Sequence, residues 1–221
     1  MVSDLRELLP VAATWWAVSL SGVMSPGPIS AMAISEGARR GAVAGPLITA
    51  GHAATELVMV GALTVGLNRV LQAPAVVGTI GILGGLVLVG MGWGIARSAR
   101  KETLGPAPAA GSPVRTGAGV VRAGILMTLG NPYWLLWWTT VGAAYFVAFH
   151  RFGPAALVLF FFGGHIALDL AWTSFLAVTV GAGRGCLPVA AYRAVLGLCG
   201  VFVVGMGGFF LYSGVGLLTR R

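Results

Sequence analysis

Six stretches of this sequence are each long and apolar enough to cross a lipid bilayer as an α-helix. They cover roughly residues 10–35, 42–67, 74–96, 118–148, 154–180 and 190–217. A transmembrane helix needs about 20 consecutive apolar residues. Only 9% of the 221 residues are charged, against about 25% in a soluble domain. The chain therefore predicts an all-α integral membrane protein, and the composition, with its two cysteines, excludes a soluble enzyme and a disulfide-rich secreted domain.

The six stretches form two groups of three, joined by a polar segment. Residues 101–117 are rich in Pro, Ala and Gly, so we expect them to form a cytoplasmic linker. The linker divides a single transmembrane domain, residues 1–221, into a first repeat at 1–100 and a second repeat at 118–221. More Lys and Arg residues fall on the linker's side of the membrane than on the other, which predicts that both termini lie outside. Because these basic residues are spread between apolar stretches, the net charge of +8 does not indicate a nucleic-acid partner.

The second stretch of each group carries the same short motif. The sequence GHAATE at 51–56 corresponds to GHIALD at 164–169, so the pattern Gly-His-x-x-x-acid occurs twice. Since each group has an odd number of spans, the second group must insert upside down relative to the first. The chain therefore predicts six transmembrane helices arranged as two inverted three-helix repeats. In such arrangements the substrate site lies near the midplane, where the repeats meet.

The first stretch of each group contains a helix-breaking motif, Ser25-Pro26-Gly27-Pro28 in one and Gly130-Asn131-Pro132 in the other. Proline inside a helix removes a hydrogen bond and clashes with the preceding turn. Freed backbone groups at membrane depth need protein or a water-filled cavity around them, and the start of the next helix suits a carboxylate. We expect broken helices 1 and 4 at a substrate site; a kink that only improves packing is the alternative. The residues expected to bind substrate are Ser25, Pro26, Gly27, Pro28, Asn131, Pro132, Glu56 and Asp169.

The two His–acid pairs are candidates for ion chemistry. His52 lies four residues before Glu56, and His165 four before Asp169, so each pair shares one helix face. A carboxylate at the bilayer centre costs about 2.5–3.5 kcal/mol and therefore indicates a role. We expect these four residues to couple transport to protons. Two alternatives remain: they ligate a divalent metal, or they only hydrogen-bond helices together.

Aromatic and small residues carry weaker signals. Trp15 and Trp16 are typical of an interfacial anchor, whereas Trp134, Trp137 and Trp138 line a cavity or face lipid. Small residues at helical spacing favour close packing within the chain over a homodimer face. They are Gly78, Gly81, Gly85, Gly90 and Gly94 in the third stretch and Gly200, Gly205, Gly207, Gly208, Gly214 and Gly216 in the sixth.

Two segments resemble signatures of the LysE/RhtB amino-acid exporter family. SPGPISAMAISEGARRGAVAG at 25–45 is similar to the first, a Pro-Gly-Pro followed by small residues and a basic Gly-rich turn. LGNPYWLLWW at 129–138 is similar to the second, an Asn-Pro in the first span of the second half. The length, the six spans and the basic central loop match as well. The resemblance implies a small secondary-active exporter of amino acids or related metabolites, driven by an ion gradient.

These observations together lead us to expect an exporter of amino acids or amino-acid-like metabolites in the cytoplasmic membrane. It would work as a proton antiporter, with no cofactor and no enzymatic activity. Its partners would be the small-molecule substrate, protons, the lipid bilayer and, on the small-residue faces, a second copy of the chain. The main alternative is a divalent heavy-metal exporter that uses His52, Glu56, His165 and Asp169 as ligands. A membrane metalloprotease is disfavoured because the sequence has no His-Glu-x-x-His.

Overall fold

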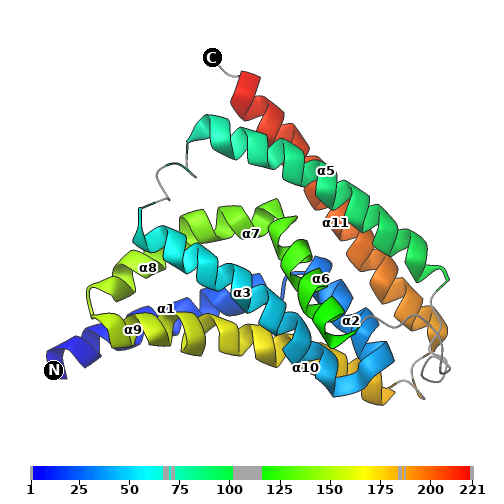
Figure 1. Ribbon diagram of the computed structural model, residues 1–221, viewed down its shortest axis with the longest axis horizontal. Coiled ribbons are helices and arrows are strands. Elements are labelled where there is room, and N and C mark those ends of the chain that lie inside the picture. The colour runs from blue at the N-terminus through cyan, green and yellow to red at the C-terminus, as the bar shows by residue number, and fades with distance from the viewer. Residues whose placement is uncertain are drawn as a thin grey trace.

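The computed structural model describes residues 2–66, 70, 73–101, 116–183, 186 and 188–219, and in this part of the chain it contains helices and no strand. The α-helices are α1 (Val2–Val23), α2 (Pro28–Arg40), α3 (Ala44–Thr64), α5 (Pro74–Ala99), α6 (Gly117–Leu129), α7 (Pro132–Trp137), α8 (Ala143–His150), α9 (Pro154–Val158), α10 (Ala167–Ala182) and α11 (Val189–Thr219). A 3-10 turn, η1 (Gly41–Val43), joins α2 to α3. Two π-helical segments, η2 (Trp138–Gly142) and η3 (Leu159–Ile166), join α7 to α8 and α9 to α10. Figure 1 shows their arrangement.

Four helical stretches of the described chain are long and apolar enough to cross a membrane. They are Pro28–Thr64, Pro74–Ala99, Pro154–Ala182 and Val189–Thr219. These four stretches confirm the prediction of an all-α membrane protein. The predicted spans at 10–35 and 118–148 are not single helices, because the structure divides each of them into shorter helices.

Both divisions occur at the proline motifs. α1 ends at Val23 and α2 begins at Pro28, while α6 ends at Leu129 and α7 begins at Pro132. Each proline occupies the first turn of its new helix, where the missing N–H costs nothing because it would lack a partner anyway. The side chain of Asn131 caps α7 by accepting a hydrogen bond from the backbone N–H of Tyr133. Local backbone chemistry therefore explains both interruptions.

Glycines allow α5 and α11 to pack closely side by side along one edge of the molecule (Figure 1). A Cβ atom on Gly85 would lie 2.8 Å from the carbonyl oxygen of Gly207, and one on Gly92 would lie 2.6 Å from that of Gly200. Close backbone approach of this kind drives association of helices in lipid, where the hydrophobic effect between helices is lost. Six of the predicted small residues thus serve packing within the chain, namely Gly78, Gly81, Gly85, Gly200, Gly207 and Gly214. The other five have open space at the Cβ position and take no part in this contact: Gly90, Gly94, Gly205, Gly208 and Gly216.

The remaining helices form the other part of the molecule, and the two motif-bearing segments cross within it. α3 and the α9–η3–α10 stretch run in opposite directions (Figure 1), and α10 packs against both α2 and α3. The predicted linker at 101–117 falls mostly on residues 102–115, which lie outside the described residues. α5 ends just before it and α6 begins at its last residue.

Trp15 is not the interfacial anchor that the sequence suggested. Its side chain is fully buried, stacks on Phe160 at 4.6 Å and donates a hydrogen bond of 2.9 Å to the Phe160 carbonyl oxygen. Trp16, the next residue, is 52% exposed. Trp15 therefore belongs to the core between α1 and η3, because adjacent helical residues point in different directions.

Candidate functional site

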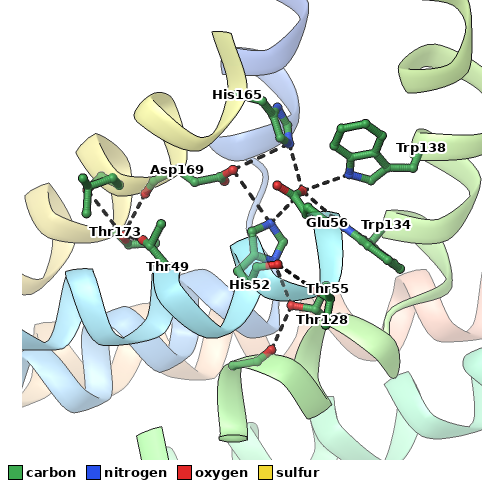
Figure 2. A network of polar contacts seen from close by, with 12 residues as sticks. Thr49, His52, Thr55, Glu56, Thr128, Trp134, Trp138, His165, Asp169 and Thr173 are labelled. Carbon is green, nitrogen blue, oxygen red and sulfur yellow. Dashed lines mark hydrogen bonds and ion pairs between the residues drawn. The ribbon is translucent and has the colours of Figure 1, made fainter. Parts of the chain in front are cut away.

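The carboxylate of Glu56 is the centre of a buried polar network (Figure 2). Its side chain is fully buried, and its Oε1 accepts hydrogen bonds from the indole N–H groups of Trp138 at 2.9 Å and Trp134 at 3.3 Å. The same oxygen lies 3.1 Å from Nε2 of His52 and 3.0 Å from Nε2 of His165. Its Oε2 makes no hydrogen bond to any residue that the structure describes. Oε1 is thus surrounded by hydrogen-bond donors, whereas Oε2 can still accept a hydrogen bond.

Asp169, in α10, is the fourth member of the cluster. Its Oδ2 lies 3.6 Å from Nε2 of His165 and 3.8 Å from Nε2 of His52. Both separations exceed hydrogen-bond length, and within the described chain this oxygen has no hydrogen-bond partner. The two histidines and two carboxylates, which the sequence pairs on two helices, therefore converge on one point (Figure 2).

A threonine fixes the orientation of His52. The Thr128 hydroxyl donates to the backbone carbonyl of Gly124 at 2.8 Å, so its single hydrogen is used. It therefore accepts at its 2.7 Å contact with Nδ1 of His52, which must carry a hydrogen. In a neutral imidazole the lone pair then lies on Nε2, the atom that faces both carboxylates. Aromatic rings hold His165 instead: Trp137 stacks on it at 4.9 Å.

The π-helical segments help to bring these side chains together. Trp138 begins η2, and His165 lies near the end of η3. A π-turn holds an extra residue and so shifts the following side chains around the helix axis; such segments occur frequently at functional sites. No motif in the sequence signals either segment, and the hydrogen-bonding roles of Trp138, Trp134 and Thr128 could not be predicted from it.

The glycine in each repeated motif permits close packing beside the cluster. A Cβ on Gly164 would overlap the indole of Trp15, and a Cβ on Gly51 would overlap the backbone carbonyl of Val121 in α6. Larger residues at these positions would push neighbouring elements away from the histidines. The shared Gly-His pattern therefore has a steric basis in both copies.

A cavity of about 160 Å³ adjoins the cluster. The predicted site residues that line it are Ser25, Pro26, Gly27, Pro28, His52, Glu56, Asn131, His165 and Asp169. Pro132 is the exception, because it packs against Gly84 of α5. Trp134 and Trp137 also line the cavity, while Trp138 is buried behind Glu56. None of the described residues that line the cavity is Lys or Arg, so its charged groups are suited to a cation or an amine.

A second cavity of about 490 Å³ shares Pro28 with the first. Residues of α2, α5, α6 and α11 line it, among them Glu36 and Arg39 near the end of α2. The Glu36 carboxylate also accepts a hydrogen bond of 2.6 Å from Nε of Arg40. A larger cavity therefore meets the first one at Pro28 and extends along α2 as far as Arg39.

Apolar helices of membrane length around buried ionisable side chains define a multi-pass helical membrane protein. The family model for the LysE type translocator matches residues 20–214. The chain belongs to this family, as the resemblance of its two signatures implied.

Membership makes this chain a membrane transport protein with a small-molecule substrate. The matched region includes both proline motifs and both His–acid pairs. A search of curated proteins and a search of solved structures found no match to this chain.

Proposed function

We propose that this protein is a secondary-active exporter of amino acids or amino-acid-like metabolites in the cytoplasmic membrane, coupled to inward proton movement. One observation carries the proposal: Glu56 and Asp169, from two helices of opposite direction, meet two histidines beside a cavity at a helix interruption. Buried carboxylates within a membrane domain are costly and mark ion or substrate pathways.

The two ends of the cavity would suit the two opposite charges of a zwitterionic substrate. Ser25, Gly27 and Pro28, at the start of α2, would meet the substrate carboxylate, since a helix N-terminus favours negative charge. Asn131 would contribute its amide from the start of α7. Glu56 and Asp169 would bind the substrate amine, and Trp137 would contribute a cation–π contact.

The histidines would provide proton coupling. His52 and His165 each lie close to both carboxylates, and histidine exchanges protons near neutral pH. A proton on this cluster and a bound amine would compete for the same carboxylates. Mutual exclusion of this kind is what obligatory exchange requires.

Alternating access would come from movement of the first half, 1–100, against the second, 118–221, with 101–117 as the cytoplasmic linker. The opposite directions of α3 and α10 support an inverted repeat of this kind. The 490 Å³ cavity would connect the site to the cytoplasm, with both termini outside.

Transport by proteoliposomes tests the proposal. We expect the purified protein to exchange an amino acid for protons, with the exchange stimulated by a pH gradient and abolished by a protonophore. Glu56→Gln and Asp169→Asn should lower the rate at least tenfold, while Glu7→Gln, a change at an exposed carboxylate, should keep it. Unchanged rate and proton dependence in both buried variants would show that the mechanism is wrong.

The geometry also favours a second candidate, a divalent-metal exporter. One ligand atom from each of the four residues lies within 4.8 Å of the others, a convergence that amine binding does not require. Including divalent metals among the substrates in the same assay separates the two candidates.

A further inference from the structure

We propose that Nε2 of His52, Nε2 of His165 and one carboxylate oxygen from each of Glu56 and Asp169 form a four-coordinate site for a divalent transition-metal ion. The inference rests on the proposed function in one respect, because it assigns a ligand to the same cluster. An ion held by all four groups would occupy the carboxylates that the exporter mechanism assigns to the amine and the proton, so the ion would compete with both.

The spacing of the four atoms fits a tetrahedral ion. Zn–N and Zn–O bonds of about 2.0–2.2 Å give ligand-to-ligand edges of about 3.3–3.6 Å. The four His–carboxylate separations are 3.1 and 3.0 Å to Glu56 and 3.8 and 3.6 Å to Asp169. These values, measured to Oε1 of Glu56 and Oδ2 of Asp169, lie on both sides of the ideal edge, and no two of the four ligand atoms are more than 4.8 Å apart. An ion at the centre requires the side chains to draw together, and the Glu56 carboxylate to turn if its free Oε2 is the ligand.

Buried acceptor atoms without hydrogen-bond partners favour a cation at the cluster. Glu56 Oε2 and Asp169 Oδ2 are buried, and neither makes a hydrogen bond within the described chain. The lone pair of neutral His52 also faces these carboxylates, because Thr128 holds the hydrogen-bearing Nδ1 on the far side of the ring. Electron-rich atoms turned toward one another repel, and that repulsion is removed by a divalent cation among them, as it is by a proton on His52.

The surrounding residues resemble the supporting shell of a metal site. Thr128 orients one histidine, as second-shell groups do for metal-bound imidazoles. Trp138 and Trp134 hold the Glu56 carboxylate through Oε1. Two carboxylates also balance the charge of one divalent ion, which lowers the cost of burying it.

The donor set selects the class of ion. Two imidazole nitrogens with two carboxylate oxygens suit Zn²⁺ and Co²⁺. Mg²⁺ requires octahedral oxygen coordination and Ca²⁺ six to eight oxygens, which this cluster does not offer. We therefore expect binding of Co²⁺ and Zn²⁺ that excess Mg²⁺ does not displace.

Titration of the full-length purified protein with Co²⁺ tests the site. Four-coordinate Co²⁺ absorbs visible light far more intensely than hydrated Co²⁺, so the wild-type protein should develop a visible band that saturates at one ion per chain. Zn²⁺ should abolish the band, and Mg²⁺ should leave it. Absence of the band together with absence of bound Zn²⁺ in elemental analysis would overturn the inference without any variant.

Variants assign the ligands. His165→Ala and Asp169→Asn should remove the band, and Thr128→Val should weaken Co²⁺ binding about 10–100-fold. His150→Ala and Glu7→Gln, which alter an exposed histidine and an exposed carboxylate, should bind like the wild type. A band that survives both His165→Ala and Asp169→Asn contradicts the inference.

The outcome is separable from that of the transport assay. Proton-coupled amino-acid exchange without Co²⁺ or Zn²⁺ binding would refute the metal site and leave the exporter intact. Metal binding without any solute exchange would refute the exporter and leave the metal site intact.

Discussion

Nε2 of His165 lies 3.0 Å from Oε1 of Glu56, although 109 residues separate the two in the chain. The contact joins η3, in the second half of the chain, to α3, in the first. It is buried and lies beside the 160 Å³ cavity. If the two halves move against each other, this contact must either break or move with them. We therefore expect ligand binding at Glu56 to be coupled to the conformation of the protein.

Removing one donor to Glu56 should weaken the cluster. Trp138→Phe keeps an aromatic ring but loses the N–H that donates to Oε1 at 2.9 Å. Hydrogen bonds to charged groups contribute about 1.5–3 kcal/mol, so we expect a lower melting temperature in detergent and slower transport. Trp93→Phe, at a 66% exposed tryptophan, is the control. Equal melting temperatures for the two variants would show that the indole N–H contributes nothing.

Gly164→Ala should be destabilising. Its Cβ would overlap the buried indole of Trp15, and overpacking costs about 1–3 kcal/mol. Thermal unfolding in detergent should reveal a lowered midpoint. Gly163→Ala is a matched control, because the added methyl would meet only the end of the flexible Leu159 side chain. If the two variants unfold at the same temperature, the packing of Trp15 against η3 is not as described.

Gly85→Ala should loosen the pair formed by α5 and α11. The methyl group would lie 2.8 Å from the Gly207 carbonyl oxygen, so the helices must separate and lose packing. We expect a lower unfolding midpoint. Gly90→Ala has open space around its Cβ and should be neutral or stabilising by up to about 1 kcal/mol, because alanine favours helix. The reverse order of stabilities would contradict this interface.

Cys186 is a native probe of orientation. It is exposed between α10 and α11, whereas Cys199 is buried in α11. With both termini outside, Cys186 faces the cytoplasm, so a membrane-impermeant maleimide should label inside-out vesicles and leave intact cells unlabelled. Cys186→Ser should abolish the labelling. Efficient labelling of intact cells would reverse the proposed topology.

The sequence alone determined the local features of this protein. Apolar stretches predicted membrane helices, because the bilayer core sets their length and composition. Pro28 and Pro132 predicted where helices begin, since proline acts on its own backbone. The four-residue spacing placed His52 over Glu56 and His165 over Asp169, because helix geometry is local. The six-span inverted repeat stays a prediction.

Only the tertiary structure decided how the two pairs meet. Their separation depends on where α3 crosses α10, and the close approach of Gly45 in α3 to Ser174 in α10 helps to set that crossing. The donors from Trp138 and the Thr128 hydroxyl come from other helices. Trp15 turns inward because Gly164 of η3 leaves room for its indole. Contacts between distant segments depend on the fit of whole surfaces, and no short stretch of sequence contains that information.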